Sequence, residues 1–132
     1  MSDLLELSIP ITTDLAAVRA LVRDYALAFG MVAQRVELLI LAVNEAVTNV
    51  LDHGGGGGTL TARGDEQGIV VEIVDDGGTL RPEHLRQTPE PNPTSGMGLY
   101  VIRTVCDRVV LDHPDGRSRL RLYMGHSGPT AY

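Results

Sequence analysis

Two polar side chains with useful chemistry occur one helical turn apart in an otherwise apolar stretch of the sequence. Glu45 and Asn49 are four residues apart, so on a helix their side chains lie on the same face. The Glu45 carboxylate can accept a proton from a hydroxyl or water, and the Asn49 amide oxygen suits a hard cation such as Mg²⁺. A solvated face of an amphipathic helix explains the same pair equally well. Taken alone, the pair leaves a site and a plain surface as open alternatives.

Two segments rich in glycine add groups that suit a nucleotide. Asp75-Asp76-Gly77 ends a β-branched strand, and a buried carboxylate at a strand end, Asp75, could accept a hydrogen bond from an exocyclic amine such as that of adenine. Gly96-Met97-Gly98 precedes a helical pattern, and glycines there let phosphate oxygens approach the free N–H groups of a helix start. Asp-Gly-Gly is most often only a turn, and Gly-Met-Gly matches neither classical phosphate-loop pattern. The order and spacing of the three features together favour a nucleotide site.

The elements that must position these residues follow from the spacing of apolar residues. Periodicity predicts a helix over about residues 33 to 53, which carries Glu45 and Asn49. The other expected elements are a strand over Asp3–Ile9, a helix from the N-cap at 12–14 to Gly30, strands over Leu60–Arg63 and Gly68–Val74, a helix from Gly96, and a hairpin of Val109–Asp112 with Arg119–Tyr123. This order predicts a two-layer α/β (α+β) sandwich, with helices on one face of a mixed, mostly antiparallel sheet.

Length and composition narrow the function classes. The 132 residues suit a single domain, and a net charge of −6 without a basic cluster disfavours direct nucleic-acid binding. No stretch is apolar enough for a membrane span or signal peptide, and a lone cysteine, Cys106, suits a core position in a reducing compartment. We therefore expect a cytoplasmic protein that does not bind membranes. The proline-rich segment of about residues 79 to 95 is expected to be functional or mobile, and residues 125 to 132 are expected to form a flexible tail.

The three segments together resemble a known family. Glu45 to Asn49, followed by His53-Gly54, resembles the N-box of the GHKL (Bergerat) ATP-binding fold, in particular that of the anti-sigma factor serine/threonine kinases. Val74 to Gly77 is similar to the D-x-G-x-G box of that family, and Ser95 to Leu99 is similar to its G-x-G box. The resemblance covers essentially the whole chain, residues 1–132, as a single histidine-kinase-like ATP-binding domain.

The resemblance implies a role for each matching residue. Glu45 corresponds to the catalytic general base, Asn49 to the ligand of Mg²⁺, and Asp75 to the carboxylate that recognises adenine. Residues 79 to 95 correspond to a lid over ATP. The residues implied to line the nucleotide are Asn49, Asp75, Gly77, Ser95, Gly96, Met97, Gly98 and Leu99.

The resemblance also implies an activity and partners. The chain would be a homodimeric, ATP- and Mg²⁺-dependent anti-sigma factor that sequesters a sigma factor and phosphorylates a serine or threonine of an anti-anti-sigma (STAS) protein. Two positions depart from the family pattern: Thr79 replaces the second glycine of the D-x-G-x-G box, and Thr94 occupies a position that is often basic. These departures keep open an alternative, a nucleotide-binding regulatory module that sequesters a partner without kinase turnover.

Overall fold

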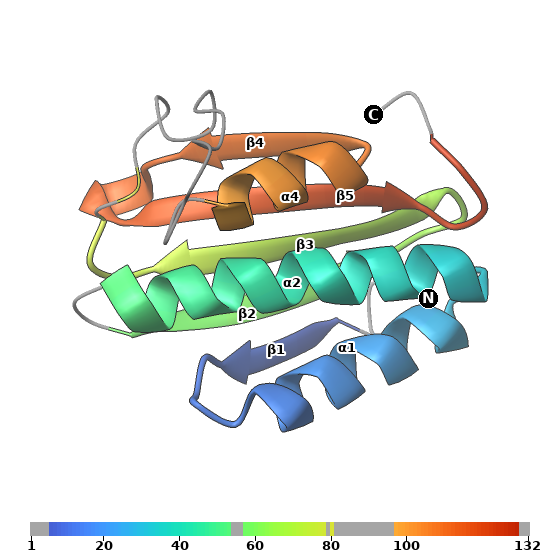
Figure 1. The fold of residues 1–132 in the computed structure, drawn as a ribbon, viewed down its shortest axis with the longest axis horizontal. Coiled ribbons are helices and arrows are strands. Elements are labelled where there is room, and N and C mark those ends of the chain that lie inside the picture. Colours follow the sequence, from blue (N-terminus) through green and yellow to red (C-terminus); the bar gives the residue numbers. More distant parts are fainter. Residues whose placement is uncertain (1–5, 54–56, 79, 81–96, 130–132) are drawn as a thin grey trace.

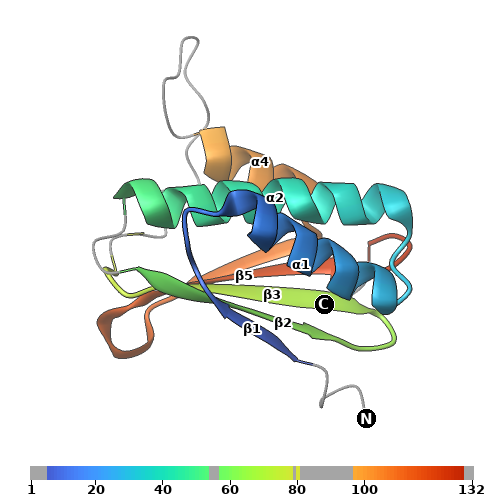
Figure 2. The ribbon, with the colours of Figure 1, turned by 90° about the horizontal axis from the view of Figure 1, so that it is seen from below.

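The computed structural model describes residues 6–53, 57–78, 80 and 97–129, which form one sheet covered on one face by helices (Figures 1 and 2). The strands are β1 (Leu7–Pro10), β2 (Gly58–Gly64), β3 (Gly68–Asp75), β4 (Arg108–Asp112) and β5 (Ser118–Gly125). The helices are α1 (Leu15–Ala28), α2 (Ala33–His53) and α4 (Met97–Val105), with the short 3₁₀ turn η2 (Pro114–Gly116) between β4 and β5. The predicted two-layer α+β sandwich is confirmed.

The strand order is β1-β2-β3-β5-β4, and every pair of neighbouring strands is antiparallel. The prediction of a mostly antiparallel sheet is therefore confirmed within the described residues. β3 is the central strand, and its β-branched run alternates between a buried face and the open face of the sheet. Its last residue, Asp75, pairs with Gly58 of β2 on one side and with Ser118 of β5 on the other.

The long helix α2 is organised by the apolar spacing that the sequence shows. Its bounds, Ala33–His53, match the predicted helix of residues 33 to 53. Val36, Leu39, Val43, Val47 and other apolar residues of one face are buried against the sheet. None of the helices in the described part of the chain is both long enough and apolar enough to cross a membrane.

The ends of the chain differ from the sequence prediction in detail. β1 begins at Leu7 and includes Pro10, which an edge strand accepts because its missing N–H is not needed by a further neighbour. The sequence predicts a flexible tail from Gly125, but Gly125 is the last residue of β5. The next residue, His126, is also fixed by backbone hydrogen bonds: its N–H donates to the Gln67 carbonyl at 3.0 Å, and its carbonyl accepts from the Val32 N–H at 2.9 Å. These long-range backbone bonds have no local signal in the sequence.

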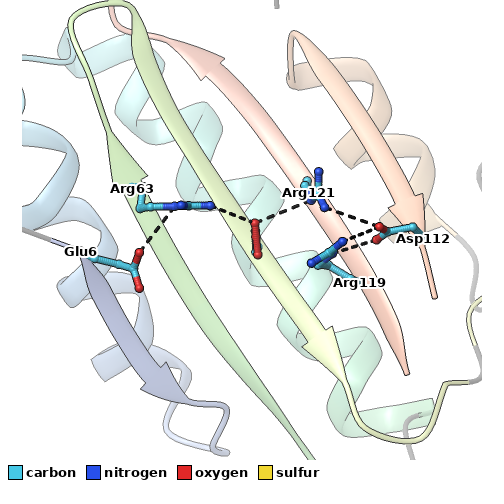
Figure 3. A network of polar contacts seen from close by, with 6 residues as sticks. Glu6, Arg63, Asp112, Arg119 and Arg121 are labelled. Atoms are coloured by element: carbon cyan, nitrogen blue, oxygen red, sulfur yellow. Dashed lines mark hydrogen bonds and ion pairs between the residues drawn. The ribbon is translucent and has the colours of Figure 1, made fainter. Parts of the chain in front are cut away.

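The face of the sheet opposite the helices carries a ladder of alternating charges (Figure 3). Glu72 of β3 lies at its centre, 3.3 Å from an Arg63 nitrogen on β2 and 3.6 Å from the Nε of Arg121 on β5. Across the sheet, the ladder runs from Glu6 through Arg63 of β2, Glu72 of β3, and Arg119 and Arg121 of β5 to Asp112 of the edge strand β4. These ion pairs join charged side chains across neighbouring strands of the open face.

The cysteine occupies the core, as the sequence predicts. Cys106 follows α4 and is 8% exposed. Burial, reinforced by the neighbouring Asp107 charge, raises the pKa of the Cys106 thiol to about 12. The protonated thiol is therefore the form that the folded state keeps, and Cys106 is unsuited to act as a nucleophile near neutral pH.

The raised pKa gives a stability prediction with a definite sign. The stabilisation that comes from keeping the Cys106 thiol protonated is fully present below the ordinary thiol pKa of 9.0 and is lost as the pH rises toward about 12. Urea unfolding between pH 8 and 11 should show a steeper loss of stability for the native chain than for Cys106→Ala. Equal slopes for the two proteins would contradict this assignment.

Candidate functional site

Glu45 and Asn49 lie together on the face of α2 that borders α4. The buried stripe of α2 anchors the helix on the sheet, which leaves these two side chains half-buried at the edge of the helix layer. Their four-residue spacing places both on one face, as predicted. Glu45 and Asn49, here called the polar stripe, therefore face α4 and do not form a plain solvated surface.

The first turn of α4 approaches this polar stripe at Gly98. A Cβ atom at Gly98 would lie 3.5 Å from the Asn49 Nδ2, 3.6 Å from the Asn49 Oδ1 and 3.6 Å from the Glu45 Cβ. These are ordinary contact distances, so the first turn of α4 lies directly beside these two side chains, with room for a methyl group and no more at Gly98. Gly98 itself places no side chain between its backbone and Asn49.

The start of α4 supplies donors to the same space. The first N–H groups of a helix have no partner within the helix, and they carry the positive end of its dipole. α4 begins at Met97, and the buried Leu99 side chain, 8% exposed, fixes the helix on the core. Leu99 can therefore line a ligand only through its backbone. The predicted site residues Ser95 and Gly96 lie outside the described residues, as does the predicted lid except for Leu80.

Asp75 and Gly77 form the turn at the end of β3. Asp75 is only 7% exposed, and its side-chain Oδ1 accepts a hydrogen bond from the Gly77 N–H at 2.8 Å. The Asp76 N–H donates to the Gly57 carbonyl at 3.0 Å, which ties the turn to the start of β2. The structure thus holds a buried carboxylate at a strand end, the environment that the sequence predicted for Asp75.

Ser118 and His113 are site neighbours that the sequence reasoning missed. Ser118 is 2% exposed and pairs with Asp75 across the β3–β5 ladder. His113 precedes the η2 turn, and its Nε2 lies 2.6 Å from the Leu80 carbonyl oxygen. The sequence placed both residues in the final hairpin but gave no sign that this hairpin pairs with β3.

The elements that carry these residues converge at one end of the molecule. Figure 1 shows the C-terminal half of α2, the end of β3 and the start of α4 toward the same side of the fold. Gly98 lies directly beside Glu45 and Asn49, whereas Asp75 and Gly77 lie at the end of β3. The arrangement offers a carboxylate at a strand end for a base and a helix start with an amide side chain for phosphates.

The described residues also limit how a metal ion can be held. Among residues 6–53, 57–78, 80 and 97–129, no group of three or more His, Cys, Asp or Glu side chains is placed to hold a metal ion. Asn49 offers one neutral oxygen, and Mg²⁺ characteristically takes few protein ligands and completes its shell with water and phosphate oxygens. The Asn49 oxygen could therefore serve as a protein ligand of a largely hydrated Mg²⁺.

Gly98→Ala tests the open space without disturbing the fold. Because a Cβ here would make only ordinary contacts, and Gly98 lies in the first turn of α4, we expect the variant to fold with a stability close to that of the native chain. The methyl group would occupy the space between α4 and Asn49, so ATP affinity should fall by about tenfold, the equivalent of one charge-assisted hydrogen bond. Thermal unfolding and calorimetric titration with ATP and Mg²⁺ measure the two effects. Unchanged ATP affinity would show that phosphate does not occupy this space.

Comparison with known proteins adds an independent observation. Residues 11–124 match the family model described as histidine kinase-like ATPase domain. An anti-sigma F factor from Clostridium acetobutylicum is 27% identical over 110 residues, which cover 75% of this chain and 76% of that protein. Two proteins named serine-protein kinase RsbW, from Bacillus mycoides and Bacillus pumilus, are 26% and 28% identical and cover 88% and 86% of this chain and 81% of each relative. The sequence is thus distantly related to anti-sigma factors and serine kinases.

A solved structure supports the fold. The crystal structure of the RsbU and RsbW domains of a Mycobacterium tuberculosis protein superposes with a TM-score of 0.66 at 16% identity. The match covers 96% of this chain and 34% of that chain, so this chain spans about a third of the length of that protein. At this identity the similarity concerns the arrangement of helices and strands alone.

Proposed function

This chain belongs to the family of histidine kinase-like ATPase domains, and from that premise we propose that it binds ATP with Mg²⁺ between α2, α4 and the end of β3. The observation that carries the proposal is the approach of Gly98 to Asn49 and Glu45, at 3.5–3.6 Å from its Cβ position. Asp75 would accept a hydrogen bond from the exocyclic amine of adenine, and Gly77 would leave room for the base. The start of α4 would receive the phosphates, and the Asn49 Oδ1 would hold Mg²⁺.

We further propose that the chain is a protein serine/threonine kinase. ATP supplies the γ-phosphoryl group, and the Glu45 carboxylate accepts the proton of the attacking serine or threonine hydroxyl. Two features support this role. Glu45 lies one turn before Asn49 beside the same space, and two distant relatives bear the name serine-protein kinase.

The partners proposed for this kinase follow from the same relatives. One is named an anti-sigma F factor, which supports a sigma factor as the sequestered partner. The phosphorylated partner would be a STAS-domain anti-anti-sigma protein, and the active form would be a cytoplasmic homodimer that binds neither nucleic acid nor membrane. The net charge of −6 supports the absence of direct nucleic-acid binding.

The experiment for this proposal uses radiolabelled ATP, Mg²⁺ and candidate STAS proteins with the purified chain. Label on a serine or threonine of one STAS protein would support the kinase assignment. ATP binding without label transfer would overturn it and favour the second candidate, a nucleotide-gated module that sequesters its partner without turnover. Thr79 and Thr94, which depart from the family pattern within the predicted lid, are the sequence features that favour this second candidate.

A further inference from the structure

Leu80 is held from both sides of its backbone by the β4–β5 hairpin. Its N–H donates to the Ser118 Oγ at 3.2 Å, and its carbonyl oxygen lies 2.6 Å from the His113 Nε2. A carbonyl oxygen only accepts, so the proton of this bond resides on Nε2 of His113. Two side chains that lie five residues apart in the hairpin therefore fix the position of one peptide segment.

The same hairpin touches the turn that carries Asp75. A Cβ at Gly78 would lie 2.1 Å from the Gly116 carbonyl oxygen, so only glycine allows the two backbones to meet this closely. Gly78 also has a positive φ of 65°, which glycine adopts without strain. Beside this contact, an Arg117 nitrogen lies 3.8 Å from an Asp76 oxygen. The η2 turn is thus packed directly against the end of β3.

These contacts fix the chain on both sides of the turn that follows Asp75: at Asp75 itself and at Leu80. On the strand side, the backbone of Asp75 is fixed by its ladder partners Gly58 and Ser118. On the exit side, the chain is fixed at Leu80 by His113 and Ser118. A carboxylate recognises a planar base well only if its orientation is set before binding, because ordering a loose turn would reduce the affinity.

We propose that His113 is a positioning residue for the nucleotide site: through the Leu80 carbonyl it fixes the turn that orients the Asp75 carboxylate toward adenine. This inference rests on the proposed ATP-binding function. It assigns His113 no contact with the nucleotide. The role depends on the Nε2–H donor, so a side chain that places an amide N–H at a similar reach should replace the imidazole.

The test compares His113→Ala with His113→Gln, and the matched control is His126→Ala. The His126 Nε2 lies 2.7 Å from the Asp65 carbonyl, so the control removes a bond of the same kind beside the β2–β3 turn, at the opposite end of β3 from Asp75. We expect His113→Ala to weaken ATP binding by about tenfold, close to the loss of one hydrogen bond, with His113→Gln restoring most of the affinity. His126→Ala should bind ATP as the native chain does, even where its melting temperature falls as much.

Amide hydrogen exchange without nucleotide provides a second measurement. His113→Ala should speed the exchange of the Leu80 N–H, whereas His113→Gln and His126→Ala should leave it slow. Native affinity in His113→Ala, equal weakening in His126→Ala, or unchanged Leu80 exchange would each overturn the positioning role alone. Absence of ATP binding by the unchanged chain would overturn the proposed ATP site itself, and the inference with it.

Discussion

Glu45→Gln is expected to lower phosphoryl transfer from ATP to the STAS partner by about 10²–10⁴-fold while leaving ATP affinity nearly unchanged. Glutamine keeps the size of the side chain and its place beside Gly98 and Asn49, but an amide cannot accept the hydroxyl proton. The ATP contacts proposed for Asn49, Asp75 and the start of α4 do not involve this carboxylate. The defect should therefore appear in the rate of transfer and not in binding.

Initial rates of label transfer, measured with saturating ATP, give the size of this effect. Glu37→Gln is the matched control, because Glu37 lies on the same helix, is exposed, and pairs with Arg23 away from α4. It should transfer label at the native rate. If Glu45→Gln were as active as the native chain, Glu45 would not be the base. If Glu45→Gln and the native chain both released the sequestered partner without any transfer, the regulatory module would be the better description.

Asp107→Ala is expected to destabilise the fold by about 3–5 kcal/mol, because it leaves Arg35, whose side chain is only 14% exposed, without its carboxylate partner. The Asp107 side chain is 5% exposed and receives the Arg35 Nη2 on both oxygens, at 2.7 and 2.6 Å. Its Oδ2 also accepts the Gly125 N–H at 2.7 Å, and the Arg35 Nε donates to the Gly125 carbonyl at 3.1 Å. One carboxylate thus joins the start of α2, the end of α4 and the end of β5.

Urea unfolding at neutral pH measures this loss. Asp112→Ala is the matched control, since Asp112 also receives an arginine through two bonds but lies 41% exposed on the edge strand β4. Water can solvate the arginines left behind there, so the control should lose far less stability. Equal losses in the two variants would contradict the importance of burial at Asp107. Replacing Arg35 and Asp107 together by Met and Leu should recover part of the loss, because no unpaired charge remains.

The sequence allowed the elements to be predicted where local spacing decides them. The apolar period of α2 and the β-branched run of β3 allowed the first and last residues of both elements to be predicted to within about one residue, since each element buries one face of a regular repeat. The side chain of Asp14 caps α1 by accepting the Ala17 N–H at 3.1 Å, as its residue type suggested. The pairing of Glu45 with Asn49 followed from the same helical geometry.

Contacts between distant parts of the chain were not accessible to this reasoning. The insertion of β5 between β3 and β4 brings Ser118 opposite Asp75, and no local pattern encodes which strands become neighbours. The bond between Arg35 and Asp107 spans 72 residues, and the order at His126 depends on the Gln67 carbonyl of another hairpin. Such pairings are selected by the global packing of the sheet, so only the folded structure reveals them.

The most direct test of the ATP site is a titration of the isotope-labelled chain with ATP and Mg²⁺, followed by backbone amide NMR. The site proposed here predicts saturable shifts that cluster at the end of β3 around Gly77, at Asn49, and at the start of α4 around Gly98. Shifts at the outer charge ladder around Glu72 should stay small, because that face lies across the sheet from the helices. The absence of saturable shifts, or a cluster centred on the ladder, would contradict an ATP site between α2, α4 and β3.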